Sequence, residues 1–583
     1  MANISSAATG DWNATSTWSG GAVPVAGDLV TILNTHDVTL TQDQPAGAVV
    51  INSGGTLTGG GFKLTLNDNA GTTFIFSSVG SGVSGKSAIE GVLDIDITGG
   101  SVDRPINEAG TGNIRNLTIN NAQTYLCHYH LTLDGDLTLT AGTLNTQNSG
   151  GTNNNLTVSG DVIIAAAGGL VCNSSTVSVD SFTISSGGTL SAPDASGSLT
   201  LNGTKDAWSF QNNSTNFSHN NGTITQTNAG HIKSVSSNPM YNFIMNSSSS
   251  DSHEAIFRPS SGTDCVIAAN DVTVTRGVLK LNTVSHNASM GSLSIGSTGT
   301  FQASSNTTTI TSEASSNYAI EVSGTYTHNS GTLKITTDNN TFVKILDDVN
   351  NLTIEPATAT RVYEYVNNTT IQGDLTINAG RFTHYSSTYS LDVQGDCTIN
   401  NTGILDGGSG SIELGSLVIA GGGEYRATTG TTTITNEKSG HAWKNNGGTF
   451  THNNGKVIID FDTGNLAGAT EVKENTFYDL EVKLDQAGYE LRLEDHSSTN
   501  AMDILNNLTV TKGIFDTMTK SDTLTIHGQT IIESDGVFTE ADHDTNKIIH
   551  NGLVTNLGTY KINDGTTVKM NGGIRNLGTI TVA

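Results

Sequence analysis

The tetrapeptide Asn556-Leu557-Gly558-Thr559 returns as Asn576-Leu577-Gly578-Thr579, and this short period of about 20 residues decides the fold. A unit of about 20 residues, made of short strands and Gly/Asn corners, cannot bury its own apolar face, but stacked units can. The stretch Leu131-Thr132-Leu133-Asp134-Gly135-Asp136-Leu137-Thr138-Leu139 shows one such unit, with apolar and polar residues alternating on either side of a Gly-Asp corner. Its four leucines are expected to point inward.

A longer repeat lies over this period. A heptapeptide with the pattern aromatic-Ser/Thr-His-Asn-Asn/Ser-Gly-Thr/Lys occurs three times, as Phe217–Thr223, Tyr326–Thr332 and Phe450–Lys456. Its histidines are His219, His328 and His452. Consecutive copies are roughly 110–125 residues apart, which is about five coils or ~24 Å along a stack, so the three cannot share a metal ion or act on one substrate. We interpret them as structural residues whose imidazole bonds a corner carbonyl.

A second motif recurs with the histidine repeat. An Asp or Asn is followed by an apolar residue and Thr, and a glycine comes six positions after the first residue; the four copies begin at Asp136, Asp271, Asp374 and Asn507. Constant offsets inside modules of variable length are typical of stacked units with loop insertions. We divide the chain into a cap with the first coils (1–80), four solenoid modules (81–195, 196–302, 303–425 and 426–545) and C-terminal coils of about 20 residues each (546–583).

The predicted fold is all-β, a right-handed parallel β-solenoid (β-helix) with coils of roughly 20–25 residues. At about 4.8 Å per coil, some two dozen coils make a rod on the order of 120 Å long. Tandem β-sandwiches, with blocks of about 100 residues, are the alternative. The short terminal repeat favours the solenoid.

Composition excludes several classes of protein. Charged residues make up 14% of the chain, against about 25% in ordinary domains, and 67 glycines with only 7 prolines fit neither collagen nor a helical bundle. A formal net charge of −27 disfavours binding to nucleic acid or to an anionic membrane, and no apolar run reaches the ~20 residues of a membrane span. The four cysteines are too scattered for a disulfide framework.

The two ends carry their own signals. The stretch Asp11–Gly21 holds Trp12 and Trp18, and a Trp-rich flap over the first coil would cover a solenoid core that is otherwise exposed. It resembles the start of the eight-glycine domain of cell-surface β-helical proteins and the N-terminal cap of bacterial and phage β-solenoids, in the first part of the chain. The chain stops inside the strand pattern Thr579–Ala583. We expect that open coil to pair with copies of itself or with other subunits.

Candidate chemistry is sparse. Asp460, Asp462 and Asn465 have the acidic alternation of a calcium loop, with Glu471 at the twelfth position but apolar residues between. We predict no cofactor, with calcium at this loop as the one exception the sequence leaves open. Hydrolysis of a polysaccharide would need two carboxylates about 5–9 Å apart, a pairing across coils that sequence spacing cannot test. Lyase chemistry would need basic residues, and the 26 lysines and arginines form no cluster.

The chain as a whole resembles long parallel β-solenoid proteins of bacteriophage virion appendages and bacterial surface adhesins. The stretches that carry the likeness are Phe450–Gly455, Asn351–Ile354 and Gly373–Ile377. The segment Met1–Ser5 has no basic or apolar leader, which favours a phage origin. The resemblance implies a non-enzymatic structural fibre or spike subunit of a virion, involved in assembly and in attachment to host-surface glycans. A secreted bacterial adhesin or filament subunit is the second hypothesis, and a β-helix polysaccharide-degrading enzyme is the third. Each of these implies an extracellular location.

Overall fold

The computed structural model describes residues 2–67, 76–78, 87–100, 104–108, 114–233, 237–258, 264–281, 285–461, 469–474, 476–486, 488–494, 501–517, 523–539, 547–563 and 566–582. The protein is all-β, with 61% of its residues in strands that stack in parallel as a β-solenoid of about 23 turns. In the described part, the helical segments are two short 3-10 turns, Thr15–Thr17 and Ser19–Gly21. No helix there has the length and apolar character that crossing a membrane requires.

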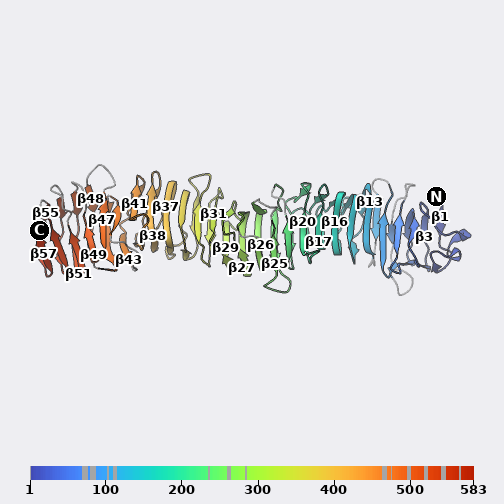
Figure 1. The fold of residues 1–583 in the computed structure, drawn as a ribbon. Helices are drawn as coiled ribbons and strands as arrows, with labels where there is room; N and C mark the ends of the chain where they lie inside the picture. The colour runs from blue at the N-terminus through green and yellow to red at the C-terminus, as the bar shows by residue number, and fades with distance from the viewer. Residues whose placement is uncertain are drawn as a thin grey trace. The chain divides into compact units, whose positions relative to one another are not determined.

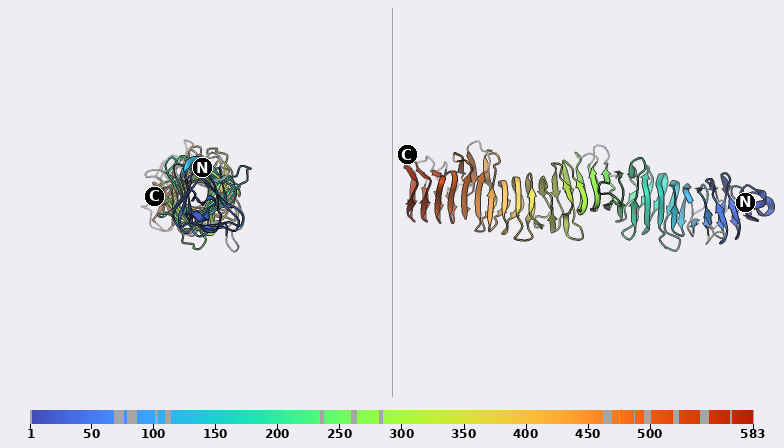
Figure 2. Two further views of the ribbon diagram at one scale, coloured as in Figure 1. Left: turned by 90° about the vertical axis from the view of Figure 1, so that its right-hand side faces the viewer. Right: turned by 90° about the horizontal axis from the view of Figure 1, so that it is seen from below.

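Strand pairing follows the coil repeat. Leu117 pairs with Leu137, which pairs with Val162, and Val162 pairs with Phe182, so each pairing advances the chain by one coil. The strands concerned are β13 (Ile114–Cys127), β15 (Leu137–Asn145), β16 (Leu156–Val171) and β17 (Thr176–Ile184). These pairs are parallel, which confirms the solenoid and excludes the sandwich alternative. Figures 1 and 2 show the strands of successive turns running side by side.

Coil length varies more than the sequence suggested. The coil that leads from Ile224 to its partner Phe243 is short, and the next coil, from Phe243 to its partner Val272, is half as long again. The strands are β22 (Thr223–Gln226), β24 (Asn242–Asn246) and β26 (Cys265–Leu281). The extra residues leave the strands at the corners, because strand positions are fixed by the neighbouring turn while a corner loop is free to lengthen.

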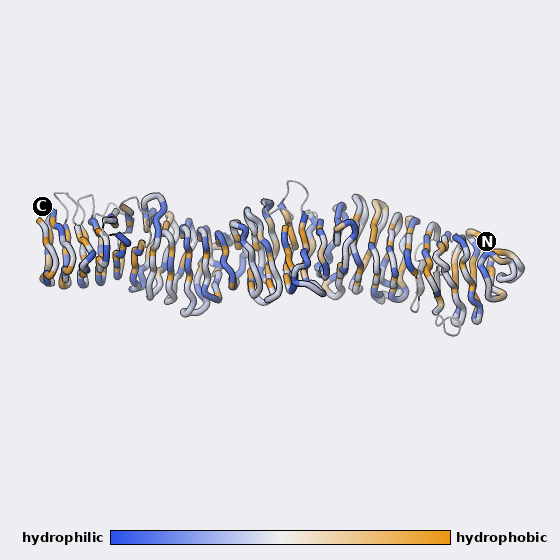
Figure 3. Tube along the Cα trace, turned by 60° about the horizontal axis from the view of Figure 1, so that its bottom comes forward, coloured by the Kyte–Doolittle hydropathy of each residue, from blue (hydrophilic) through white to orange (hydrophobic). Residues whose placement is uncertain are grey.

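The core is a column of apolar side chains. Leu131, Leu133, Leu137 and Leu139 are all buried, as their alternation predicts, and the first two form strand β14 (Leu131–Leu133). Figure 3 shows the same alternation of apolar and polar residues along strand after strand. Aromatic rings also pack edge-on in the core, as where Trp443 contacts Phe450 of the same turn at 4.7 Å and Phe477 of the next turn at 5.4 Å between ring centroids.

The chain divides into two compact units. The N-terminal unit comprises Met1–Met290 and Ile295–Gln302, and the C-terminal unit comprises Gly291–Ser294 and Ala303–Ala583. Within the N-terminal unit, strands β1 (Asn3–Ser5) and β2 (Gly10–Asp11) belong to the first coil, because each pairs in parallel with a strand of the next coil. Trp12 and Trp18 are buried there with their rings 5.0 Å apart in a T-shaped contact, and the Trp18 indole N–H donates to the Trp12 carbonyl oxygen.

Candidate functional site: corners, ladders and an outward column

Each repeated histidine begins a tight corner. Its carbonyl oxygen accepts the N–H of the glycine three positions later, and both intervening residues have positive φ, between 46° and 59°. This is the geometry of a type I′ turn, which favours Asn and Gly. The backbone N–H two positions after each histidine donates to its Nδ1; the pairs are Asn221–His219 at 2.9 Å, Ser330–His328 at 2.9 Å and Asn454–His452 at 3.0 Å.

The histidine bond differs from the predicted one. We expected the imidazole to bond a corner carbonyl, but Nδ1 accepts an N–H instead, because the positive φ values turn an amide toward the ring. A ring nitrogen that accepts is unprotonated, so the neutral imidazole carries its proton on Nε2. Burial lowers the pKa of His219, which favours the same form. The histidines hold corners in the structure.

The next coil covers these rings. Tyr241 stacks on His219 at 5.1 Å between centroids, and Tyr478 stacks on His452 at 5.6 Å. At the middle copy the amide of Asn350 donates to the Ser330 carbonyl at 2.9 Å. Because a tyrosine of the next coil covers one face of the His219 and His452 rings and Nδ1 is occupied, these histidines are poorly placed to act on a bound molecule.

The repeated Gly-Asp corners form ladders of hydrogen bonds. Asn351 Oδ1 accepts the N–H of Asp374 at 2.8 Å, and Asp374 Oδ1 accepts the N–H of Asp396 at 2.9 Å. Asp396 then accepts the Ser416 hydroxyl at 2.7 Å and binds Lys438 Nζ at 2.8 Å. A side-chain acceptor in each coil thus satisfies a corner amide of the next coil, although the corner itself is at least partly exposed.

The other copies repeat this ladder. In the first module it runs through Asn116, Asp136, Asp161 and Ser181 in the same order, and Lys205 of the second module binds Asp161, with bonds of 2.6–2.9 Å. In the fourth module Asn507 donates its N–H to Asp479 and accepts the N–H of Gln529. In the second module Asp271 donates its N–H to Asn242.

The ladder predicts the result of two substitutions. Asp374→Ala removes the acceptor for the Asp396 N–H and should lower the free energy of unfolding by about 1–2 kcal/mol. Asp374→Asn keeps an Oδ1 acceptor, as Asn507 does at the equivalent corner, and should change it by less than about 0.5 kcal/mol. Chemical denaturation of the two variants beside the unchanged protein checks this, and equal losses in both would contradict it.

The calcium pattern lies mostly outside the described residues. Asp462 and Asn465 belong to the part of the chain about which the structure gives no description. Asp460 binds Lys483 Nζ at 2.6 Å and Glu471 binds His441 Nε2 at 3.1 Å, so both described carboxylates have cationic or basic partners. Among the described residues, no three His, Cys, Asp or Glu side chains come together as metal ligands would.

The cysteines offer no second chemistry. Cys127, Cys172, Cys265 and Cys397 are all buried and none forms a disulfide. Burial raises the pKa of the Cys127 thiol to about 12, so it stays protonated and unreactive at neutral pH.

A hollow of about 440 Å³ lies beside the middle histidine corner, lined by His328, Asp347, Asp348 and Gln372 among others. Its acids are already engaged. Asp347 accepts the backbone N–H of Tyr326 at 2.8 Å, and Asp348 accepts the side-chain amide of Gln372 at 2.8 Å. Both carboxylates therefore serve the corner itself, and this hollow is a weak candidate for a binding site.

A projecting turn comes shortly before each histidine corner. Lys205 and Trp208 exchange two backbone hydrogen bonds of 2.8 and 2.7 Å, and Lys438 and His441 exchange two of 2.9 and 3.1 Å. In the third module the turn is one residue longer, and Ala314 donates to the Tyr318 carbonyl at 2.9 Å. The separation between the start of the turn and its histidine is the same in all three modules.

The residue that ends each turn starts a line of side chains across successive parallel strands, here called the outward column. Its members by module are Trp208, His231, Ile256 and Lys280; Tyr318, Phe342, Glu364 and Thr383; and His441, Glu471, Arg492 and Asp516. All of them except Thr383 are at least partly exposed. The same backbone position therefore presents an aromatic and basic surface in the second module, an aromatic surface in the third and an ionic surface in the fourth.

The Trp208 patch, defined as Trp208, His231 and Arg258, lies in the N-terminal unit. The His231 ring meets Trp208 edge-on at 5.5 Å, and the Arg258 guanidinium carbon lies 5.6 Å from the Trp208 ring centroid. Arg258 Nη2 is 3.1 Å from His231 Nε2, so the guanidinium donates to an unprotonated ring nitrogen. Desolvation and the Arg258 charge both lower the pKa of His231.

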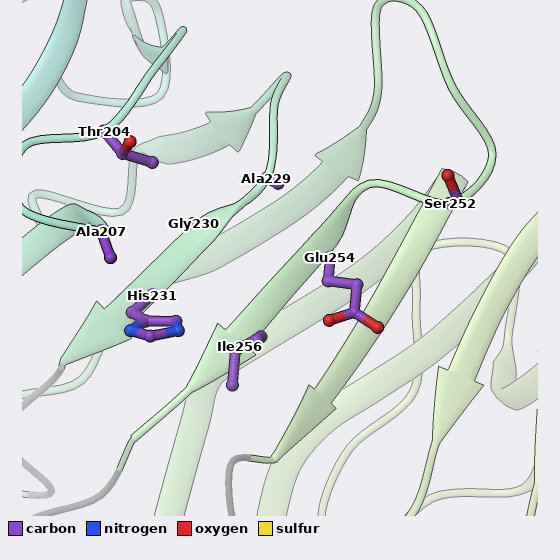
Figure 4. A pocket seen from close by; sticks show the side chains of 8 residues that line it. All are labelled: Thr204, Ala207, Ala229, Gly230, His231, Ser252, Glu254 and Ile256. Atoms are coloured by element: carbon purple, nitrogen blue, oxygen red, sulfur yellow. The ribbon is translucent and has the colours of Figure 1, made fainter.

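Two hollows flank this patch. One of about 170 Å³ is lined by Trp208 with Lys205, Asp206 and Gln211 among others. The other, of about 390 Å³, is lined by His231 with seven further residues. Figure 4 shows Thr204 and Ala207 toward one end of the larger hollow and Ser252 and Glu254 toward the other, with His231 and Ile256 between them. The strands are β20 (Trp208–Asn212), β23 (Gly230–Lys233) and β25 (Glu254–Phe257).

The Tyr385 patch, defined as Tyr318, Phe342 and Tyr385, lies in the C-terminal unit. Phe342 packs 5.4 Å from Tyr318 and 5.4 Å from Tyr385, between ring centroids. Tyr385 is 63% exposed, more than is usual for a tyrosine. The patch is therefore an accessible aromatic surface supported by a second and a third ring.

Two acids lie side by side on neighbouring coils. Asp392 and Glu413 are partners in strands β37 (Leu391–Asp406) and β38 (Ile412–Ala420). Desolvation raises the pKa of both groups, with Asp392 adding to the effect on Glu413. Neither residue lines any of the three hollows above.

The fold and these surfaces define a class: a parallel β-solenoid repeat protein whose corners recur unchanged and whose outward columns differ between modules. No protein-family model, curated protein or solved structure matches the chain.

Proposed function

We propose that this protein is a non-enzymatic structural fibre or spike subunit of a phage virion that attaches to glycans on a host surface. The observation that carries the proposal is the outward column, which places aromatic side chains at one backbone position in two modules. Aromatic faces bind the apolar faces of sugar rings without a deep pocket. A solenoid of stacked coils supplies the rigid support that such shallow sites need.

A secreted bacterial adhesin or surface-filament subunit is the alternative within the same class. Both roles use the same surfaces, so attachment alone does not separate them. The neighbouring genes do: capsid and tail genes support the virion subunit, and secretion genes support the adhesin.

Binding to a glycan array tests the attachment role. We expect the full chain to bind at least one class of surface polysaccharide. Where binding uses the C-terminal unit, Tyr385→Ala should lower the affinity by about fivefold, which is the contribution of one aromatic contact. Tyr129→Ala is the control, because Tyr129 is also exposed but belongs to neither patch. An array with no hits would overturn the attachment role.

The competing function is a polysaccharide-degrading enzyme, which Asp392 and Glu413 would favour as the paired acids with raised pKa. We expect no release of reducing ends or unsaturated uronates from a panel of polysaccharides. Release that disappears in Glu413→Gln but persists in Glu424→Gln, a change at a carboxylate paired with Arg426, would instead establish the enzyme.

A further inference from the structure

Trp208 is the one tryptophan of four that the fold leaves at the surface. Trp12, Trp18 and Trp443 are fully buried, whereas Trp208 is partly exposed at the end of a projecting turn. A tryptophan in the core would bury more apolar area, so its position at the surface calls for another explanation.

Arg258 has no acidic partner among the described residues, in contrast to most arginines of the chain. Six others contact a carboxylate, namely Arg115, Arg276, Arg361, Arg381, Arg426 and Arg492. The described residues give Arg258 only the ring nitrogen of His231 and the face of Trp208, and its Nε is buried with no hydrogen-bond partner among them. An arginine has five N–H donors, of which the described residues use one on Nη2; the buried Nε does not reach a surface ligand, so the remaining Nη donors are those that an anion could use.

The charges around Arg258 do not compensate it. Glu254, at the start of the strand that Arg258 follows, is bound to Lys280 at 2.6 Å, and Asp161 is bound to Lys205 at 2.9 Å. Asp206, on the projecting turn, is exposed and lines the smaller hollow. Among the described residues, Trp208 thus lies beside a cation that has no acidic partner there, and it lines a hollow that also presents hydrogen-bond acceptors.

We propose that the Trp208 patch binds an acidic sugar unit of a polysaccharide, a uronic acid or another hexose bearing a carboxylate. The sugar ring lies against Trp208, its carboxylate accepts hydrogen bonds from the Arg258 guanidinium, and its hydroxyls donate to Asp206 and Gln211. Arginine binds carboxylates with two parallel N–H donors, which fixes the orientation of the ring. This inference rests on the attachment role proposed above and names the class of glycan.

The test compares two ligands on the unchanged full-length protein. Tetragalacturonate is the probe, and its methyl ester is the control, because esterification removes the charge and keeps the ring. In a buffer of about 0.15 M salt, which screens the net negative charge of the chain beyond about 8 Å, the acid should bind about tenfold more tightly than the ester. Equal affinities would overturn the proposal without any variant having to fold.

Variants assign the effect to residues. Arg258→Gln should bind the acid and the ester equally, and Trp208→Ala should weaken both by about tenfold. Arg276→Gln, which changes an arginine already paired with Asp251, should behave as the unchanged protein. A preference for the acid that survives in Arg258→Gln would overturn the site. If the full chain binds glycans on the array and the Trp208→Ala and Arg258→Gln variants bind them equally well, only this inference is overturned. An array without hits would overturn the attachment role as well.

Discussion

Gly455→Ala is expected to lower the free energy of unfolding of the coils around residues 427–456 by about 3 kcal/mol. Gly455 closes the third histidine corner, and a Cβ there would overlap the carbonyl oxygen of Thr428 in the coil below. Backbone cannot move aside as a flexible side chain can, so the two coils must separate or the corner must open. Hydrogen exchange of the backbone amides in these coils, together with the denaturation midpoint, measures the loss.

Gly488→Ala is the matched control, because an added Cβ at this exposed glycine meets nothing within 4 Å. It should leave both measurements close to those of the unchanged protein. Gly222 and Gly331 close the other two corners and meet the carbonyl oxygens of Pro193 and Ser304 in the same way, so alanine there should cost about as much as at Gly455. Normal exchange protection in Gly455→Ala would show that the corner is not packed as described.

The sequence predicted the fold because the solenoid repeats its physical requirements in every turn. Inward leucines at Leu131 to Leu139 follow from alternation alone, and the recurrence of Asn556–Thr559 requires stacking. The histidine heptapeptide was recognised as a structural repeat, yet its bond was assigned to the wrong partner. That prediction was wrong because of the backbone conformation: two consecutive positive φ values turn an amide N–H, and not a carbonyl, toward the ring.

The outward column was missed, although a signal for it was present. Its turns begin at a constant separation before each histidine, but their residues differ, with Asp206-Ala207 in one copy and Ser439-Gly440 in another. A search for identical letters passes over positions that share only a conformation. The contact between Arg258 and Trp208 could not be predicted from the sequence. Because the coils differ in length, the sequence alone does not say which residues of successive coils lie beside one another.

The fold contains two kinds of position, which differ in whether the packing of neighbouring coils depends on the residue they carry. Corner residues such as Asn453 and Gly455 contact the coil below, and any change in them is felt by the neighbouring turn. Column residues such as Trp208 and Tyr318 face away from the core, and the strand pairing does not depend on which side chain they carry. The outward side chains can therefore vary from module to module while the stack is preserved, as the attachment role that we propose would require.

His550 makes the C-terminal unit sensitive to acid. Its side chain is fully buried, with Nδ1 2.7 Å from the Thr530 hydroxyl and Nε2 2.9 Å from the Tyr560 hydroxyl. Desolvation lowers its pKa from 6.5 to about 4. As the pH falls below 6.5 the unfolded chain binds a proton that the folded chain excludes, so stability decreases through this window until the folded-state pKa is reached. Each pKa unit is worth about 1.4 kcal/mol, so the full loss approaches about 3 kcal/mol.

His550→Gln isolates this contribution, because an amide keeps a donor and an acceptor near the two hydroxyls but does not titrate. The variant should be less stable at pH 7, and its stability should fall less steeply than that of the unchanged protein between pH 6.5 and 4. Its control is His527→Gln, at a histidine whose side chain is 44% exposed and paired with Asp503; that change should not flatten the acid limb. The test is to compare the denaturation midpoints of the variants and the unchanged protein across this pH range. Parallel curves for His550→Gln and the unchanged protein would mean that water reaches the ring and that the imidazole titrates in the folded state much as it does in the unfolded chain.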